Sequence, residues 1–217
     1  MEIRGNFTHQ LVEVKQEIQK MGQQVKQSLS LAIEAFQQGN VMKMEKVIQG
    51  DIEINQMELA INDEVVLMIA KQQPVAGDLR KLIVALKISS DLERIGDLAV
   101  DMAKVSKRID TNYLTGQRDV LLEMADIACN MLETSLNAYM TSDILVAQRI
   151  AMLDDKVDQM YGQYIRDIMN LGTEALRAEQ TTQLAFLGRY IERIADYATN
   201  VAEWVVYEVN GKHFDLN

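Results

Sequence analysis

Acidic side chains recur at every fourth position in one stretch of the sequence, at Glu93, Asp97 and Asp101. The string around them, ERIGDLAVDMA (93–103), returns as ERIADYATNVA (192–202), ninety-nine residues later (192 − 93 = 99). On a helix with 3.6 residues per turn, a spacing of four places side chains along one face. The pattern therefore predicts a row of carboxylates on one helix face, present twice in a duplicated chain.

Three further groups of oxygen-bearing side chains share this spacing. If the helices that carry them are neighbours, each half of the chain holds a cluster of hard oxygen donors. Such clusters suit Mg²⁺, Mn²⁺, Ca²⁺ or, where carboxylates bridge, polynuclear iron. The groups are Glu192, Asp196 and Asn200 in the second copy of the string, Asp51 and Asn55 upstream of the first copy, and Asp154 and Asp158 upstream of the second.

A solvated helix face is the competing interpretation of these rows, because most charged helix faces contact only water. On a helical wheel Ile95, Leu98 and Met102 form a core stripe away from the carboxylates. However, like charges four residues apart disfavour a helix by about 0.2–0.5 kcal/mol per pair, a cost that Arg94 and Lys104 offset in part. Because both rows repeat in register, we favour a cation site as the hypothesis.

The sequence offers little for catalysis. Its two histidines, His9 and His213, lie outside the duplicated strings, and no Glu-x-x-His pair of the di-iron type occurs. We expect the single cysteine, Cys129, to be a buried inert thiol. A non-catalytic protein is favoured; a carboxylate-bridged metalloenzyme, such as an oxidase or a phosphohydrolase, and a metal-independent helical scaffold stay open as alternatives.

Composition narrows the class of protein further. The 217 residues include 32 acidic and 22 basic side chains, for a net charge of −10. Because binding to a phosphate backbone needs clustered Lys and Arg, and none occur, we exclude nucleic acid as a partner. No stretch approaches the roughly 18–20 apolar residues of a membrane span, and the first residues show no apolar signal region. We expect a cytoplasmic protein without membrane insertion.

Helical periodicity runs through the whole chain, which predicts an all-α fold. Gly39-Asn40 and Ser142-Asp143 mark equivalent turns in the two halves, Pro74 marks another, and the segment 110–116 is the best linker candidate. Six long helices are expected, near 6–38, 41–72, 75–107, 117–140, 143–171 and 177–209.

The duplication divides these helices into two tandem three-helix bundles, at 1–110 and 111–217. Each half has about 100 residues, enough to bury its own core. Helices of about 30 residues are about 45 Å long. We therefore expect two rod-like bundles, lying side by side or end to end.

Several of these segments carry a family resemblance. QPVAGDLRKL (73–82) followed by SDLERIGDLAVDMA (90–103) resembles the first-repeat signature of the PhoU family, and ERIADYATNVAEWVVYEVNG (192–211) is similar to its C-terminal signature. The resemblance covers essentially the whole chain. It implies a cytoplasmic, non-catalytic regulator of phosphate uptake and phosphate-starvation signalling. It also implies contact with the phosphate ABC transporter and, in many bacteria, with a membrane sensor histidine kinase; a homodimer is also possible.

The resemblance further implies metal sites, of iron, zinc, manganese or magnesium, on paired E(D)-x-x-x-D motifs that coincide with the rows described above. Asn55 and Asn200 depart from these motifs, since an amide oxygen is a weaker ligand than a carboxylate. With Asn200 in the place of Asp101, the two sites are predicted to differ. Asp78 and Arg80 occur only in the first half, where they are candidates for partner binding; for Asp78, a helix-start acid is the alternative.

Overall fold

Six long helices make up the regular structure of the protein. The structure, a computed structural model, describes residues 2–110, 116–170 and 178–213. Every helix expected from the sequence is present, with each end within a few residues of its expected place. The helices are α1 (Glu2–Gln38), α2 (Val41–Gln72), α3 (Ala76–Ser106), α4 (Gln117–Thr141), α5 (Ile144–Asn170) and α6 (Ala178–Asn210).

The two expected α-hairpin turns use the same chemistry. Gly39 ends α1 in the left-handed region at φ 62°, and the Asn40 side chain accepts a hydrogen bond from the backbone N–H of Lys43. At the equivalent turn Ser142 adopts φ 54°, and Asp143 Oδ1 accepts from the backbone N–H of Leu145 at 2.9 Å. Each cap satisfies an amide that the first helical turn leaves free. The duplicated halves therefore turn at matching residues.

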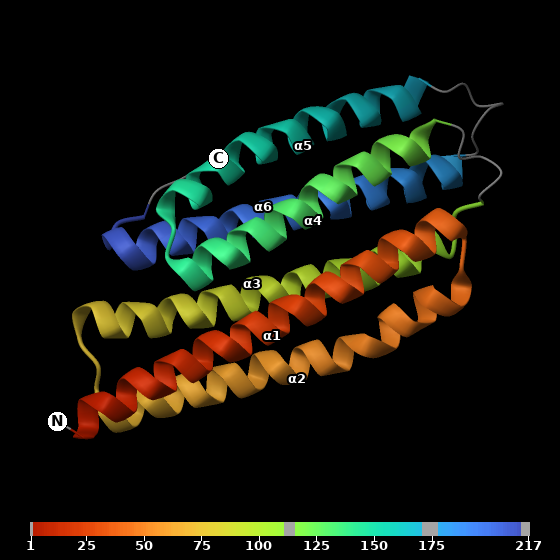
Figure 1. The fold of residues 1–217 in the computed structure, drawn as a ribbon. Coiled ribbons are helices and arrows are strands. Elements are labelled where there is room, and N and C mark those ends of the chain that lie inside the picture. Colours follow the sequence, from red (N-terminus) through yellow and green to blue (C-terminus); the bar gives the residue numbers. More distant parts are fainter. Residues whose placement is uncertain (1, 111–115, 171–177, 214–217) are drawn as a thin grey trace.

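The helices form two three-helix bundles that lie side by side as elongated rods (Figure 1). α1, α2 and α3 pack on one another, as do α4, α5 and α6; α3 against α6 and α1 against α4 join the bundles. This confirms the expected all-α duplication. The division at residue 110 stays a prediction, because 111–115 lie outside the described residues. Across the described segments, no helix combines the length and the apolar character needed to cross a membrane.

Buried side chains follow the expected helical stripes, with one difference in α3. Val14, Ile18 and Val25 of α1 are fully buried. In α3 the small residues Gly96, Ala99 and Ala103, beside the expected core stripe, are also buried. Leu98, which belongs to that stripe, is only partly buried. The reason is that α3 packs against α6 as well as α1 and α2, so its core face is wider than one stripe. α3 and α6 are thus the central helices of the molecule.

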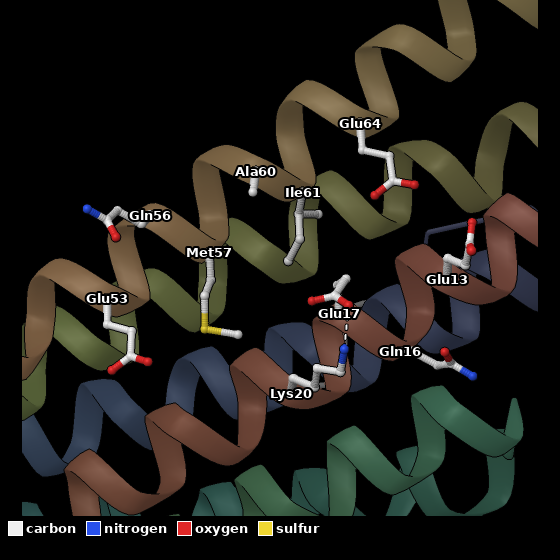
Figure 2. A pocket seen from close by; sticks show the side chains of 10 residues that line it. All are labelled: Glu13, Gln16, Glu17, Lys20, Glu53, Gln56, Met57, Ala60, Ile61 and Glu64. Carbon is white, nitrogen blue, oxygen red and sulfur yellow. Dashed lines mark hydrogen bonds and ion pairs between the residues drawn. The ribbon is translucent and has the colours of Figure 1, made fainter.

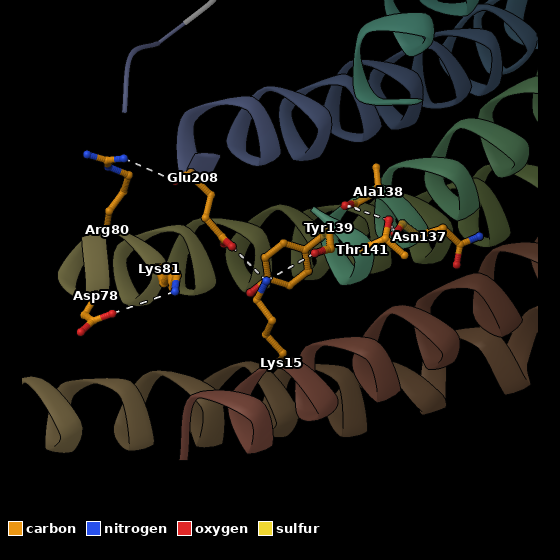
Figure 3. A network of polar contacts seen from close by, with 9 residues as sticks. All are labelled: Lys15, Asp78, Arg80, Lys81, Asn137, Ala138, Tyr139, Thr141 and Glu208. Atoms are coloured by element: carbon orange, nitrogen blue, oxygen red, sulfur yellow. Dashed lines mark hydrogen bonds and ion pairs between the residues drawn. The ribbon is translucent and has the colours of Figure 1, made fainter. Parts of the chain in front are cut away.

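A buried ion pair connects the two bundles. Lys15 of α1 donates to Glu208 Oε1 of α6 at 2.9 Å, and both side chains are largely shielded from water. The Lys15 ammonium also lies 4.5 Å from the centroid of the Tyr139 ring of α4. Arg80 of α3 donates to the Glu208 backbone carbonyl at 3.4 Å, so residues from four helices converge here (Figure 3). This network links the two bundles in addition to the packing of α3 on α6 and of α1 on α4.

Removing one member of the buried pair should destabilise the fold. Lys15→Met leaves the Glu208 carboxylate buried without a cationic partner, a change that typically costs about 3 kcal/mol. Urea unfolding followed by circular dichroism measures this loss.

Lys20→Met is the matched control on the same helix, because Lys20 pairs with Glu17 on the surface. It should cost less than about 1 kcal/mol. The double variant Lys15→Met with Glu208→Gln should recover part of the lost stability, since no buried charge is left over. Equal effects of Lys15→Met and Lys20→Met would contradict this assignment.

Candidate metal centre

Close packing of α5 on α6 creates the tightest acidic group among the described residues. An added Cβ at Gly188 would lie only 3.1 Å from the Tyr164 ring, so the glycine permits this approach. Just beyond it, one carboxylate oxygen from each of Asp158, Glu192 and Asp196 lies within 4.8 Å of the other two. The structure therefore brings together three of the predicted ligands from two helices.

Burial and mutual repulsion disfavour the charged forms of this group. Burial raises the pKa of Glu192 from 4.5 to about 7, with a further increase from Asp196 and a decrease from Arg189. Burial, followed by the charge of Asp196, raises the pKa of Asp154 from 3.8 to about 6. The pKa of Asp196 is raised by burial and by Asp158. Burial is the largest cause of each shift and a neighbouring carboxylate is the next, so a positive charge placed at this group would be favourable.

Two buried carboxylate oxygens at this site also lack a hydrogen-bond partner in the described part of the chain. Asp154 Oδ1 and Glu192 Oε2 are buried, and neither oxygen accepts a hydrogen bond from the described residues. A buried acceptor without a partner costs about 1–3 kcal/mol. A hard cation between these carboxylates would remove that cost and the repulsion together. The residues of the second bundle therefore fit a metal ion.

Two arginines of α6 form ion pairs with the acidic side chains of the same helix. Arg189 bonds to Glu192, and Arg193 Nε lies 3.9 Å from Asp196 Oδ2. The Arg189 and Arg193 side chains are nearly half exposed, so they neutralise the row only in part. Asn200, the third predicted position on α6, is half-buried, and its role as a ligand stays a prediction.

In the first bundle the same helices are again closely packed. An added Cβ at Gly96 would lie 3.2 Å from Ile54, which marks the approach of α2 to α3. Burial raises the pKa of Asp51, and Asp97 raises it further, so the two rows do lie near each other. Burial and Asp97 likewise raise the pKa of Glu93. The predicted juxtaposition is present in both bundles.

The two clusters differ in how far their charges are already neutralised. Asn55 Nδ2 donates to Asp51 Oδ2 at 3.1 Å, and Lys104 lies 3.2 Å from Asp101. Arg94 bonds to Asp97 at 3.1 Å, as the i+3 spacing predicts. Among the described residues no three carboxylates of this bundle come as close together as those of the second. Asp51 Oδ1 and Asn55 Oδ1 are nevertheless buried without a donor, so a weaker site fits here.

Two neighbours of the clusters were not identified from the sequence. Glu58 adds its negative charge to those acting on Glu93. The Thr199 hydroxyl is fully buried and lowers the pKa of Asp154, against the larger effects of burial and Asp196. Helical periodicity gives a signal for Glu58, since it lies seven residues after Asp51, two turns along the same face. Thr199 carries no such signal.

The remaining predicted residues lie away from both clusters. Arg80 is engaged at the contact between the bundles, and Asp78 lies in the first turn of α3, 4.0 Å from Lys81. Their role in partner binding stays a prediction. His9 is exposed and pairs with Glu13, as expected of a surface residue. His213 is exposed too, but its ring stacks on Tyr207 with a centroid distance of 4.0 Å.

Cys129 is expected to be a buried, inert thiol, and the structure agrees with this expectation. It lies partly buried on α4, and burial raises its pKa to about 11. A thiol with such a pKa stays protonated at neutral pH and is a poor nucleophile. Cys129 therefore contributes to packing.

Comparison with known proteins gives a consistent result for sequence and structure. A model described as the PhoU domain matches residues 18–106 and, again, residues 121–205. A phosphate-specific transport system accessory protein PhoU homolog of Clostridium acetobutylicum is 35% identical over 219 residues, covering 99% of both chains. The Escherichia coli accessory protein PhoU is 35% identical over 216 residues, which cover 98% of this chain and 88% of the relative.

Solved structures show the same similarity. The crystal structure of PhoU from Pseudomonas aeruginosa superposes with a TM-score of 0.90 at 30% identity, covering 95% of this chain and 100% of the other. The phosphate transport system regulatory protein PhoU from Streptococcus pneumoniae also has a TM-score of 0.90 at 30% identity, covering 96% and 99%.

The raised pKa values predict a pH dependence for the metal-free protein. Between the ordinary and the raised pKa of Glu192, the folded state binds more protons than the unfolded chain. The contribution of Glu192 to the free energy of unfolding is then fully present below its ordinary pKa of 4.5 and is lost as the pH rises towards 7. In the presence of a chelator, the urea midpoint should be higher at about pH 5 than at about pH 8.

Glu192→Gln should reduce this difference, because an amide does not titrate. Asp126→Asn, at an exposed position of α4, is the control and should leave the difference unchanged. A pH difference of the same size in Glu192→Gln as in the unaltered protein would contradict the assignment.

Proposed function

Because the chain belongs to the PhoU family, we propose that it regulates phosphate uptake and phosphate-starvation signalling by direct contact with other proteins. The curated relatives are named accessory proteins of the phosphate-specific transport system, which supports an accessory role in phosphate transport. The proposed partners are components of the phosphate ABC transporter and a membrane sensor histidine kinase. A cytoplasmic location without membrane insertion is part of this proposal, and so is a possible homodimer.

The metal-binding part of the proposal rests on the group formed by Asp158, Glu192 and Asp196. We assign these residues, with Asp154 beside them, as ligands of the stronger site. A bound ion, iron, zinc, manganese or magnesium, would be held by these residues of α5 and α6 and would supply the positive charge that the group lacks. The weaker site consists of the first-bundle positions Asp51, Asn55, Glu93, Asp97 and Asp101. Asn200 is proposed as a further oxygen ligand of the second-bundle site.

A regulatory rather than catalytic role follows from the chemistry of the ligands. The predicted ligands are carboxylates and amides, and neither His9 nor His213 lies in a cluster. A catalytic centre needs a nucleophile, a base and a group that orients the base. The described clusters supply only carboxylate and amide oxygens as ligands, which suits ion binding between two helices. We therefore propose that the protein is not an enzyme.

The two clusters should differ in measured metal content. After loading with Zn²⁺, Mn²⁺ or Fe²⁺ and desalting, inductively coupled plasma mass spectrometry should find bound metal on the unaltered protein. Glu192→Gln with Asp196→Asn should lose most of it, because two of the three closest ligands are neutralised.

The matched control changes the equivalent residues of the first bundle, Glu93→Gln with Asp97→Asn. This variant should retain most of the metal, since Lys104 and Asn55 already compensate part of that cluster. Metal at the background level on the unaltered protein would overturn the metal-binding proposal. Equal losses in both variants would overturn the ranking of the two sites.

Contact with the transporter is tested in cells. An affinity-tagged copy, isolated from phosphate-rich and from phosphate-starved cultures, should co-purify phosphate ABC transporter components, identified by mass spectrometry. The amounts should differ between the two conditions if the contact is regulatory. If neither culture yields a transporter or kinase component, contact regulation is contradicted, whatever the metal content.

A further inference from the structure

A groove between α1 and α2 stands apart from both carboxylate clusters. It has a volume of about 720 Å³ and is lined by residues from both helices (Figure 2). Its floor includes the half-buried Met57 and the buried Ile61, both pointing from α2 towards α1. The lining residues are Glu13, Gln16, Glu17, Lys20, Glu53, Gln56, Met57, Ala60, Ile61 and Glu64.

The rim of this groove carries an excess of negative charge. Four glutamates line it against one lysine, and Lys20 is already paired with Glu17 of its own helix at 2.6 Å. Burial raises the pKa of Glu64, and the charges of Glu13 and Glu17 across the groove raise it further. The carboxylates therefore repel one another, and a positively charged occupant would relieve the repulsion.

The spread of these carboxylates indicates an extended occupant rather than a single ion. Glu53 and Glu64 are eleven residues apart on α2, about 16 Å along the helix axis. Among the described residues, the glutamates of the groove do not converge as closely as the group around Glu192. A chain segment with several positive charges matches this spacing, and its apolar side can cover Met57.

The duplicated half provides an internal comparison. The alignment of 51–57 with 154–160 can be extended to the preceding helices at the same offset. It places Glu123 at the position of Lys20 and Lys156 at the position of Glu53. There Lys156 bonds to Glu123 at 3.1 Å and links α5 to α4 across the equivalent face. In the first bundle Lys20 is paired within α1, and Glu53 accepts a hydrogen bond from Gln24. The rim is therefore more acidic in the first bundle, where Glu53 stands at the position of Lys156, although Glu64 has an acidic counterpart in Asp167.

We propose that the groove between α1 and α2 is a docking site for a basic amphipathic helix of another protein. Its lysines or arginines face Glu13, Glu17, Glu53 and Glu64, and its apolar side lies on Met57. A second copy of this chain is a poor match, because the chain is acidic overall and has no run of basic residues. Anionic membranes and nucleic acids are repelled by the same rim. The proposal does not depend on metal binding.

The test uses a fluorescein-labelled amphipathic helix of about 12 leucine and lysine residues, a length that spans the groove. Its binding to the full chain is measured by fluorescence anisotropy. Glu13→Gln with Glu64→Gln should weaken binding about fivefold, the effect of losing two solvent-exposed charge pairs. The control, Asp126→Asn with Asp167→Asn, removes the same charge from exposed positions of α4 and α5 and should leave binding unchanged.

Three results would overturn the proposal. The first is no binding of the peptide to the unaltered chain. The second is equal weakening in the groove variant and the control, which would mean attraction to net charge alone. The third is equally tight binding of a glycine and lysine peptide of the same charge, which would exclude a role for the apolar floor. Glu192→Gln with Asp196→Asn should bind the peptide normally, so failure of the metal proposal is distinguished from failure of this one.

Discussion

Repulsion between carboxylates on adjacent helices is the constraint on which the proposed function depends. Glycines at the helix contacts, Gly96 on α3 and Gly188 on α6, let the neighbouring helix approach closely. The approach that buries the core also presses two acidic rows together, where burial and like charge raise the pKa values of Asp51 and Glu192. A fold that maintains this repulsion twice is well suited to holding a cation, whose binding then stabilises the packed helices.

The two bundles apply this plan unequally. In the first, a lysine and an amide already compensate part of the acidic row. In the second, three carboxylates converge, whereas buried oxygens without a donor among the described residues occur in both bundles. The contact between α3 and α6, with the Lys15–Glu208 pair beside it, joins the two clusters through one continuous core. Divergence of the repeats therefore gave each half different surface chemistry on one shared scaffold.

Sequence periodicity was sufficient to predict the helices, the duplicated turns and the placement of the acidic rows on neighbouring helix faces. These features depend on local spacing, as at Asn40 and Asp143, and local spacing is visible in a sequence. Which of the two clusters is the stronger candidate metal site could not be predicted from the sequence, because it depends on side-chain conformation and burial across helices. Asn200 in place of Asp101 predicted a difference, but the difference arises from the convergence of Asp158 with Glu192. The role of Arg80 at the bundle contact likewise needed the tertiary structure.

The central claim is that the second-bundle cluster binds a metal ion. Anomalous diffraction at the absorption edge of the loaded metal, from crystals grown without chelator, tests it most directly. The account predicts the strongest anomalous peak between the carboxylates of Asp158, Glu192 and Asp196, and a weaker peak or none beside Asp51 and Asp97. A map without a peak at the second-bundle cluster, or with its only peak elsewhere on the molecule, would contradict it.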